Sequence, residues 1–126
     1  MADQQAAEAV PDDSLHPADR AEKALTMVNV WAIDKDIALK LLLLELVRLH
    51  GENTLAMKTL EPNPQAIELC RAGEPDVSAY VYTFAQNHGR YGIDLKYPIS
   101  AHNIVGENEN LSLDRTLEII AIHLFS

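Results

Sequence analysis

Cysteine is scarce in this sequence, which has a single one, Cys70, among 126 residues. One cysteine cannot form a disulfide within the chain, and it cannot supply the several thiolates of a Cys-rich zinc site. The opening residues 1–13 lack the basic segment and the apolar run of a secretory signal, and their acidic side chains are atypical of a transit peptide. These absences are typical of a reducing compartment, and we expect a cytoplasmic location.

Uninterrupted apolar runs and a surplus of basic residues are also lacking. The most apolar stretch, residues 25–49, is interrupted by six charged side chains, whereas a membrane-spanning helix needs about 20 residues with few charges. Ten Lys and Arg face nineteen Asp and Glu, for a net charge of −9. Because an acidic surface repels phosphates and anionic lipids, we expect neither a nucleic-acid partner nor a membrane partner.

The acidic residues that are present gather near the two ends of the chain. Residues 1–22 contain six acids and one base, and residues 98–126 contain four acids and one base. The segment between them has nine acids and eight bases and is nearly neutral. An acidic surface on a neutral, apolar middle favours a basic protein partner.

Length and composition indicate one folded domain. A chain of this length that is 48% hydrophobic can bury about two-thirds of its unfolded surface around a single core. Residues 1–17 have almost no large apolar side chain, so burial cannot offset the entropy that ordering them would cost. We predict a disordered acidic tail over residues 1–17 and a single globular domain over residues 18–126.

A Leu-rich segment predicts the central helix. Asp34 is a candidate N-cap. Arg48 and His50 suit the C-terminal end of a helix dipole, and Gly51 follows them. These signals predict a helix over residues 35–50. Its nine large apolar side chains cover more than the one stripe that a surface helix needs, so we expect this helix to be largely buried, inside the domain or at a subunit interface.

The other segments predict a small sheet with further helices. We expect a helix over residues 18–33, where β-branched residues leave a strand as the alternative. A short strand is predicted over residues 54–60 and a helix over residues 64–72. Two arms of alternating apolar residues flank the turn-forming residues 86–90, which predicts a β-hairpin over about 80–97.

The C-terminal part predicts a loop and a last helix. Residues 98–110 are rich in Asn and Gly and indicate an irregular loop. Ser112 is a candidate cap for a helix that follows it, although β-branched residues leave a terminal strand open. The whole order predicts an α+β fold, with a small antiparallel sheet containing the hairpin packed against three to four helices.

The hairpin and the loop after it contain four polar residues suited to acid–base chemistry, namely His88, Arg90, Asp94 and His102. Such a group can act on a phosphate ester. No nucleophile motif, phosphate loop or metal spacing accompanies it, and turn residues are usually only solvated. We therefore predict no enzyme activity, no metal and no cofactor. A small hydrolase using His88, Asp94 and His102 remains an alternative hypothesis.

Most of the aromatic residues lie in the same hairpin, as Tyr80, Tyr82, Phe84, Tyr91 and Tyr97. Alternating arms favour cross-strand packing as their role, with an exposed aromatic binding face as the alternative. A surface for stacking RNA bases needs interleaved basic residues, and this hairpin has few.

The C-terminal acids Glu107, Glu109, Asp114 and Glu118 are the candidate partner-binding residues, against the simpler reading of a solvated surface. We predict a protein-binding module. Its most concrete form is an acidic neutralising partner, an immunity protein or antitoxin-like inhibitor, of a basic effector such as a nuclease toxin. The second hypothesis is a secretion-type chaperone that forms a homodimer through the Leu-rich helix.

Overall fold

The computed structural model describes residues 22–125. The predicted tail over residues 1–17 lies outside the described part of the chain. In chain order the elements are β2 (Glu22–Ala24), α2 (Met27–Ala32), α3 (Ile37–His50), β3 (Leu55–Lys58), β4 (Ala66–Arg71), β5 (Glu74–Tyr82), β6 (Tyr91–Lys96), the 3-10 turn η3 (Ser100–His102), β7 (Ile104–Leu111) and α4 (Leu113–Phe125).

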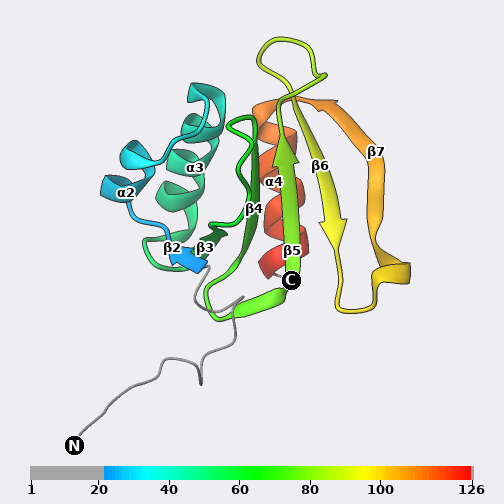
Figure 1. Ribbon diagram of the computed structural model, residues 1–126, viewed down its shortest axis with the longest axis horizontal. Helices are drawn as coiled ribbons and strands as arrows, with labels where there is room; N and C mark the ends of the chain where they lie inside the picture. The colour runs from blue at the N-terminus through cyan, green and yellow to red at the C-terminus, as the bar shows by residue number, and fades with distance from the viewer. Residues whose placement is uncertain (1–21, 126) are drawn as a thin grey trace, which may run out of the picture.

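The six strands form one antiparallel sheet in the order β2-β3-β4-β5-β6-β7, so that neighbours in the chain are neighbours in space. The helices α2, α3 and α4 pack against one face of this sheet (Figure 1). A sheet with helices on one face is an α+β architecture, as the sequence predicts. Within residues 22–125, β2 and β7 are the outer strands of this sheet.

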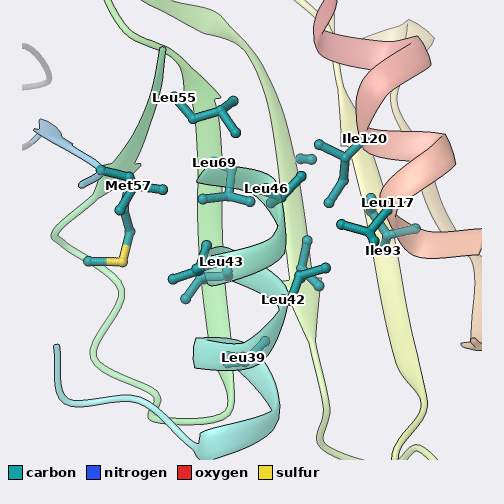
Figure 2. Packing of buried hydrophobic residues seen from close by; sticks show 14 of the residues in the cluster. Leu39, Leu42, Leu43, Leu46, Leu55, Met57, Leu69, Ile93, Leu117 and Ile120 are labelled. Atoms are coloured by element: carbon teal, nitrogen blue, oxygen red, sulfur yellow. The ribbon is translucent and has the colours of Figure 1, made fainter. Parts of the chain in front are cut away.

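The core lies between the helices and the sheet. Side chains alternate along a strand, so every second residue of β3, β4, β5 and β6 points toward the helices. Figure 2 shows the leucines of α3 directed at the strands, with Leu117 and Ile120 of α4 beside them. The large, fully buried side chains of this core include Leu39, Leu42, Leu43, Leu46, Leu55, Ile67, Leu69, Ile93 and Ile120.

Helix α3 lies close to the range predicted for the Leu-rich helix. The predicted N-cap, Asp34, is wrong, because Asp36 occupies this position, without a capping hydrogen bond from its side chain. Gly51, with a φ of 94°, follows the last residue of the helix. One face of α3 packs on the sheet, but Ile37, Leu41 and Leu49 are exposed. The prediction of a largely buried helix is therefore not confirmed, because a second apolar face of α3 points outward.

The predicted helix over residues 64–72 is wrong, because this segment contains strand β4, which pairs with β3 on one side and β5 on the other. Ile67 and Leu69 point into the core, and the residues between them point to the other face. So short an apolar run fits the helical and the strand period alike, and pairing on both sides decides between them. Gly73, with a φ of 83°, belongs to the turn into β5 rather than to a helix end.

The predicted loop over residues 98–110 is also wrong over most of its length. It contains η3 and the edge strand β7, which pairs with β6. Asn, Gly and Glu have low strand propensity and conceal this element in the sequence. The pairing is irregular at two places, where Gly106 and Asn110 have positive φ values of 76° and 53°.

The segment predicted as one helix over residues 18–33 contains, in its described part, strand β2 and the short helix α2. A capping box starts α2 at Thr26. The Thr26 hydroxyl accepts a hydrogen bond from the Asn29 backbone N at 3.1 Å, and Asn29 Oδ1 accepts one from the Thr26 backbone N at 2.8 Å. Local capping therefore ends the strand and begins a helix within a few residues.

The predicted hairpin is formed by β5 and β6, and its close packing predicts a large effect of one methyl group. Gly92 lies opposite Tyr82, and a Cβ added to Gly92 would come within 2.3 Å of the Tyr82 ring. We expect Gly92→Ala to lower the free energy of unfolding by about 1–3 kcal/mol, measured by urea denaturation. In a Tyr82→Ala background the same change should cost much less. An equal cost in both backgrounds would contradict this packing.

Candidate functional site

The sheet has a second face that no helix of residues 22–125 covers. Because Ala79 and Val81 of β5 point into the core, Tyr80 and Tyr82 point the other way. The same alternation applies to the neighbouring strands. This open face carries Lys58 of β3, Glu68 and Cys70 of β4, Ser78, Tyr80 and Tyr82 of β5, and Gly92, Asp94 and Lys96 of β6.

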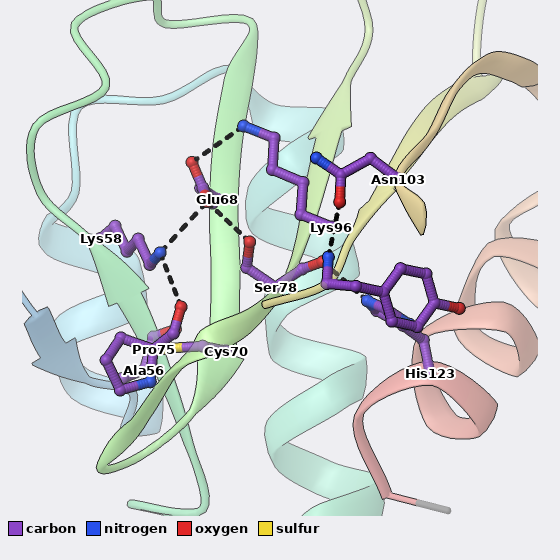
Figure 3. A network of polar contacts seen from close by, with 10 residues as sticks. Ala56, Lys58, Glu68, Cys70, Pro75, Ser78, Lys96, Asn103 and His123 are labelled. Atoms are coloured by element: carbon purple, nitrogen blue, oxygen red, sulfur yellow. Dashed lines mark hydrogen bonds and ion pairs between the residues drawn. The ribbon is translucent and has the colours of Figure 1, made fainter. Parts of the chain in front are cut away.

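A charged network centred on Glu68 occupies the middle of the open face. Figure 3 shows the Glu68 carboxylate between two lysines, with Lys58 Nζ at 3.2 Å from Oε2 and Lys96 Nζ at 3.6 Å from Oε1. The Ser78 hydroxyl donates a third contact, at 2.7 Å. Lys58 Nζ also donates to the Pro75 carbonyl at 2.9 Å. The two lysines and Glu68 together have a net charge of +1.

The electrostatics of this network favour the ionised form of Glu68. Burial alone would raise the pKa of Glu68, but the Ser78 hydroxyl and the two lysines outweigh it, so the pKa is lowered from its ordinary value of 4.5. Glu68 thus remains a carboxylate at neutral pH. It links its own strand, β4, to β3, β5 and β6.

The lowered pKa predicts an acid-dependent loss of stability. A carboxyl group whose pKa is lower in the folded protein stabilises it above the unfolded pKa, and this contribution is lost as the pH falls through the folded pKa. We expect Glu68→Gln to lower the free energy of unfolding by about 1.5–3 kcal/mol at neutral pH. The difference from the parent should shrink below pH 4.5, the ordinary pKa of the group.

Denaturant titrations at several pH values measure this effect. Glu74→Gln is the matched control, because Glu74 is exposed and lies 3.8 Å from the exposed Arg71, where an ion pair contributes little. A Glu68→Gln variant whose difference from the parent stays constant with pH would rule out the network as the cause.

Beside this network the open face carries a ladder of three aromatic rings. The centroids of Tyr80 and Tyr82 are 5.9 Å apart, and those of Tyr82 and Phe84 are 4.7 Å apart in a stacked arrangement. Lys96 Nζ lies 5.3 Å from the centroid of the Tyr80 ring. The aromatic residues of the hairpin therefore lie on both faces of the sheet, because Tyr91 is in the core on the helix side.

Acidic groups border the aromatic ladder. Glu109 Oε2 accepts a hydrogen bond from the Tyr82 hydroxyl at 2.8 Å, and Asp94 Oδ1 accepts one from the Gly106 backbone N at 2.9 Å. Burial, together with the contact to Glu109, raises the pKa of Tyr82, so its hydroxyl remains a donor. Asn108 pairs with the core residue Ile93, which directs the residues on either side of Asn108 toward the open face.

We define the open-face patch as Tyr80, Phe84, Asp94, Glu107 and Glu109, together with Tyr82, which is itself buried and whose ring lies between those of Tyr80 and Phe84. Of the four acids predicted as a partner-binding site, the structure places Glu107 and Glu109 in this patch. Asp114 and Glu118 lie on exposed positions of α4, in the helical layer on the other side of the sheet. Glu118 accepts a hydrogen bond from Arg115 at 2.7 Å. The four acids therefore do not form one surface.

Sequence reasoning left an exposed aromatic binding face as the alternative to cross-strand packing, and it missed the contribution of Asp94 to this patch. The signal for the aromatic face was present as an alternation that runs through β5 and continues past its end, in which Tyr80, Tyr82 and Phe84 are spaced by two residues. It predicts that the three share a face. It does not say which face the helices cover.

The residues of the hydrolase hypothesis do not converge. His88 precedes β6, Asp94 lies within it, and His102 lies in η3 after it. Six residues of strand span about 20 Å, so the two histidines lie beyond opposite ends of that length. Among residues 22–125 no group of three or more His, Cys, Asp or Glu side chains is placed to hold a metal ion.

The remaining residues to be placed are Arg90 and Cys70. Arg90 and His88 line a cavity of about 660 Å³ between the β5–β6 loop and the first residues of α3. Cys70 is buried, and burial raises the pKa of its thiol to about 12. A thiol that stays protonated is a poor nucleophile, so Cys70 packs rather than reacts.

Comparisons with protein families, curated proteins and solved structures find no significant similarity to this chain. No helix in the described range 22–125 has both the length and the apolar character needed to cross a membrane.

Proposed function

We propose that this chain is a protein-binding module that recognises a basic partner through the open-face patch. The observation that carries this proposal is the aromatic ladder, bordered by carboxylates, on a sheet face that no helix of residues 22–125 covers. Aromatic residues are enriched at the centres of protein interfaces, and charged residues at the rim provide specificity. The patch combines both.

The patch is also ordered before any partner arrives. The Tyr82 ring packs over Gly92, its hydroxyl is bonded to Glu109, and Phe84 stacks on it. Side chains that are already held in place lose little entropy on binding. This order supports a role in recognition.

The chemistry of the patch suits lysine and arginine side chains. Lys96 of the same chain lies over the Tyr80 ring, and the faces of such rings attract cations. Glu107 and Glu109 are exposed and supply the opposite charge. A basic segment of a partner protein matches both features.

The finer form of the proposal is a neutralising partner, an immunity protein or antitoxin-like inhibitor. Its carboxylates would occupy the basic groove of an effector such as a nuclease toxin. The net charge of −9 supports this form, because long-range attraction accelerates association with a basic protein.

A capture experiment with two charge-reversed variants tests the proposal. Three proteins are immobilised and exposed to native lysate. They are the parent, a β7 variant with Glu107→Lys and Glu109→Lys, and an α4 variant with Asp114→Lys and Glu118→Lys. Both variants replace two acids by two bases and so have the same net charge. We expect a basic protein to be retained by the parent and the α4 variant and lost from the β7 variant, as quantified by mass spectrometry.

Two results would contradict the proposal. Equal loss from both variants would mean that only net charge matters. Retention by both would place the interface elsewhere on the molecule.

A further inference from the structure

Helix α3 carries a second apolar stripe on its outer face. Ile37 and Leu41 are 60% and 48% exposed, and Leu44 is half-buried. With Arg48 these positions repeat at intervals of four, three and four residues, which is the spacing of a coiled-coil seam. Nothing in residues 22–125 covers Ile37 and Leu41 fully, so this stripe has room for another surface.

Charged residues flank the stripe in a self-complementary way. By the 3.6-residue period, Lys40 and Glu45 lie on opposite sides of it. In a parallel pair of α3 helices, Lys40 of one copy faces Glu45 of the other, at the five-residue offset of the ion pairs that flank coiled coils. Glu45 already holds Arg48 of its own chain at 2.6 Å and would then lie between two cations. An antiparallel pair does not bring Lys40 and Glu45 together.

A protruding side chain and a cavity also lie on opposite flanks of the stripe. α2 lies on the Lys40 side, because Lys40 Nζ donates to the Trp31 carbonyl at 3.1 Å. The cavity of about 660 Å³ opens on the other side, where Ala38, Leu41 and Leu113 contribute to its lining. Trp31 is 57% exposed. A parallel pair thus sets Trp31 of each copy against the cavity of the other.

From these features we propose that a second copy of this chain covers the outer face of α3, in a two-fold dimer with the two α3 helices parallel. The apolar stripes form the seam, and Lys40 pairs with Glu45 of the second copy on both sides of it. Trp31 packs into the cavity of the other copy. The open-face patch lies on the opposite side of the sheet, so this dimer leaves it accessible, and the two proposals stand or fail separately.

Sedimentation equilibrium over a wide concentration range, with the emission of Trp31 recorded in parallel, tests the dimer. Trp31 is the only tryptophan of the chain, so its emission reports this contact alone. We expect the parent to dimerise, with emission shifted to the blue as the dimer forms. Leu41→Glu should weaken dimerisation by at least about a hundredfold, because the seam would bury a carboxylate.

Ile122→Glu on α4 is the matched control. Ile122 is 59% exposed, and its replacement should leave dimerisation unchanged. Far-UV circular dichroism and thermal melts check that both variants are folded. A monomeric parent, or a Leu41→Glu variant that dimerises as the parent does, would overturn the proposal.

Oxidative cross-linking tests the parallel arrangement. Parallel helices place residue 37 of one copy beside residue 37 of the other, whereas antiparallel helices separate the two. We expect Ile37→Cys to form a disulfide-linked dimer and Ile122→Cys to remain monomeric under denaturing conditions, with the buried Cys70 unreactive in both. A dimer that Ile37→Cys fails to cross-link would overturn the parallel pairing.

Discussion

Replacing Leu43 by Asp is expected to unfold the protein. Leu43 is fully buried on the face of α3 that packs on the sheet. A carboxylate without a partner at such a site costs several kcal/mol, which is comparable with the whole stability of a small domain, about 5–15 kcal/mol. Far-UV circular dichroism and thermal melts should show no cooperative transition.

Truncations on the same face measure the packing contribution. We expect Leu42→Ala and Leu46→Ala each to lower the free energy of unfolding by about 2–5 kcal/mol. Leu60 is exposed, so Leu60→Ala should change it by no more than about 0.5 kcal/mol, and Leu60→Asp should fold. If all the variants on the buried face were tolerated, α3 would not be the centre of the core.

The second large effect is expected on binding, once the basic partner is purified. Glu107→Lys with Glu109→Lys should weaken the complex at least about a hundredfold. A close charge pair across an interface contributes from about 1.5 kcal/mol upward, and each reversal adds repulsion to the loss. The fold should persist, because Glu107 is exposed and losing the hydrogen bond from the buried Tyr82 hydroxyl to Glu109 costs about 1–3 kcal/mol, which is less than the whole stability of a small domain. Titration calorimetry or surface plasmon resonance measures the change.

Salt dependence provides the independent check on this result. The affinity of the parent should fall as ionic strength rises, and the association rate of the β7 variant should be lower than that of the parent. Asp114→Lys with Glu118→Lys should bind nearly as the parent does. Parental affinity of the β7 variant, with no salt dependence of the parent, would show that these acids form only a solvated surface.

The elements that the sequence predicts correctly are those whose signals are local. α3 has a basic C-terminal end and a glycine after it, both within one segment, whereas its N-cap is Asp36 rather than the predicted Asp34. Alternating arms and the turn between them predict the β5–β6 hairpin. Ser112 predicts the start of α4, and its hydroxyl accepts a hydrogen bond from the Arg115 backbone N at 3.1 Å. Short-range hydrogen bonds and side-chain periods decide these elements.

The elements that the sequence predicts wrongly depend on neighbours far along the chain. β4 is a strand because β3 and β5 pair with it on both sides. β7 is a strand in spite of its Asn, Gly and Glu residues because the backbone of β6 supplies partners for it. No local signal specifies either pairing, since each forms only when the sheet assembles.

The candidate site shows the same division. The sequence alone determined that the protein is acidic, that its C-terminal segment is rich in carboxylates and that Tyr80, Tyr82 and Phe84 follow one alternating pattern. Only the tertiary structure decided that the helices cover the other face, that Glu109 meets Tyr82 and that Asp114 and Glu118 lie in a different layer. The physical reason is that composition and period act within a segment, whereas the contact between Glu109 and Tyr82 requires the register of three strands and the irregular pairing of β6 with β7.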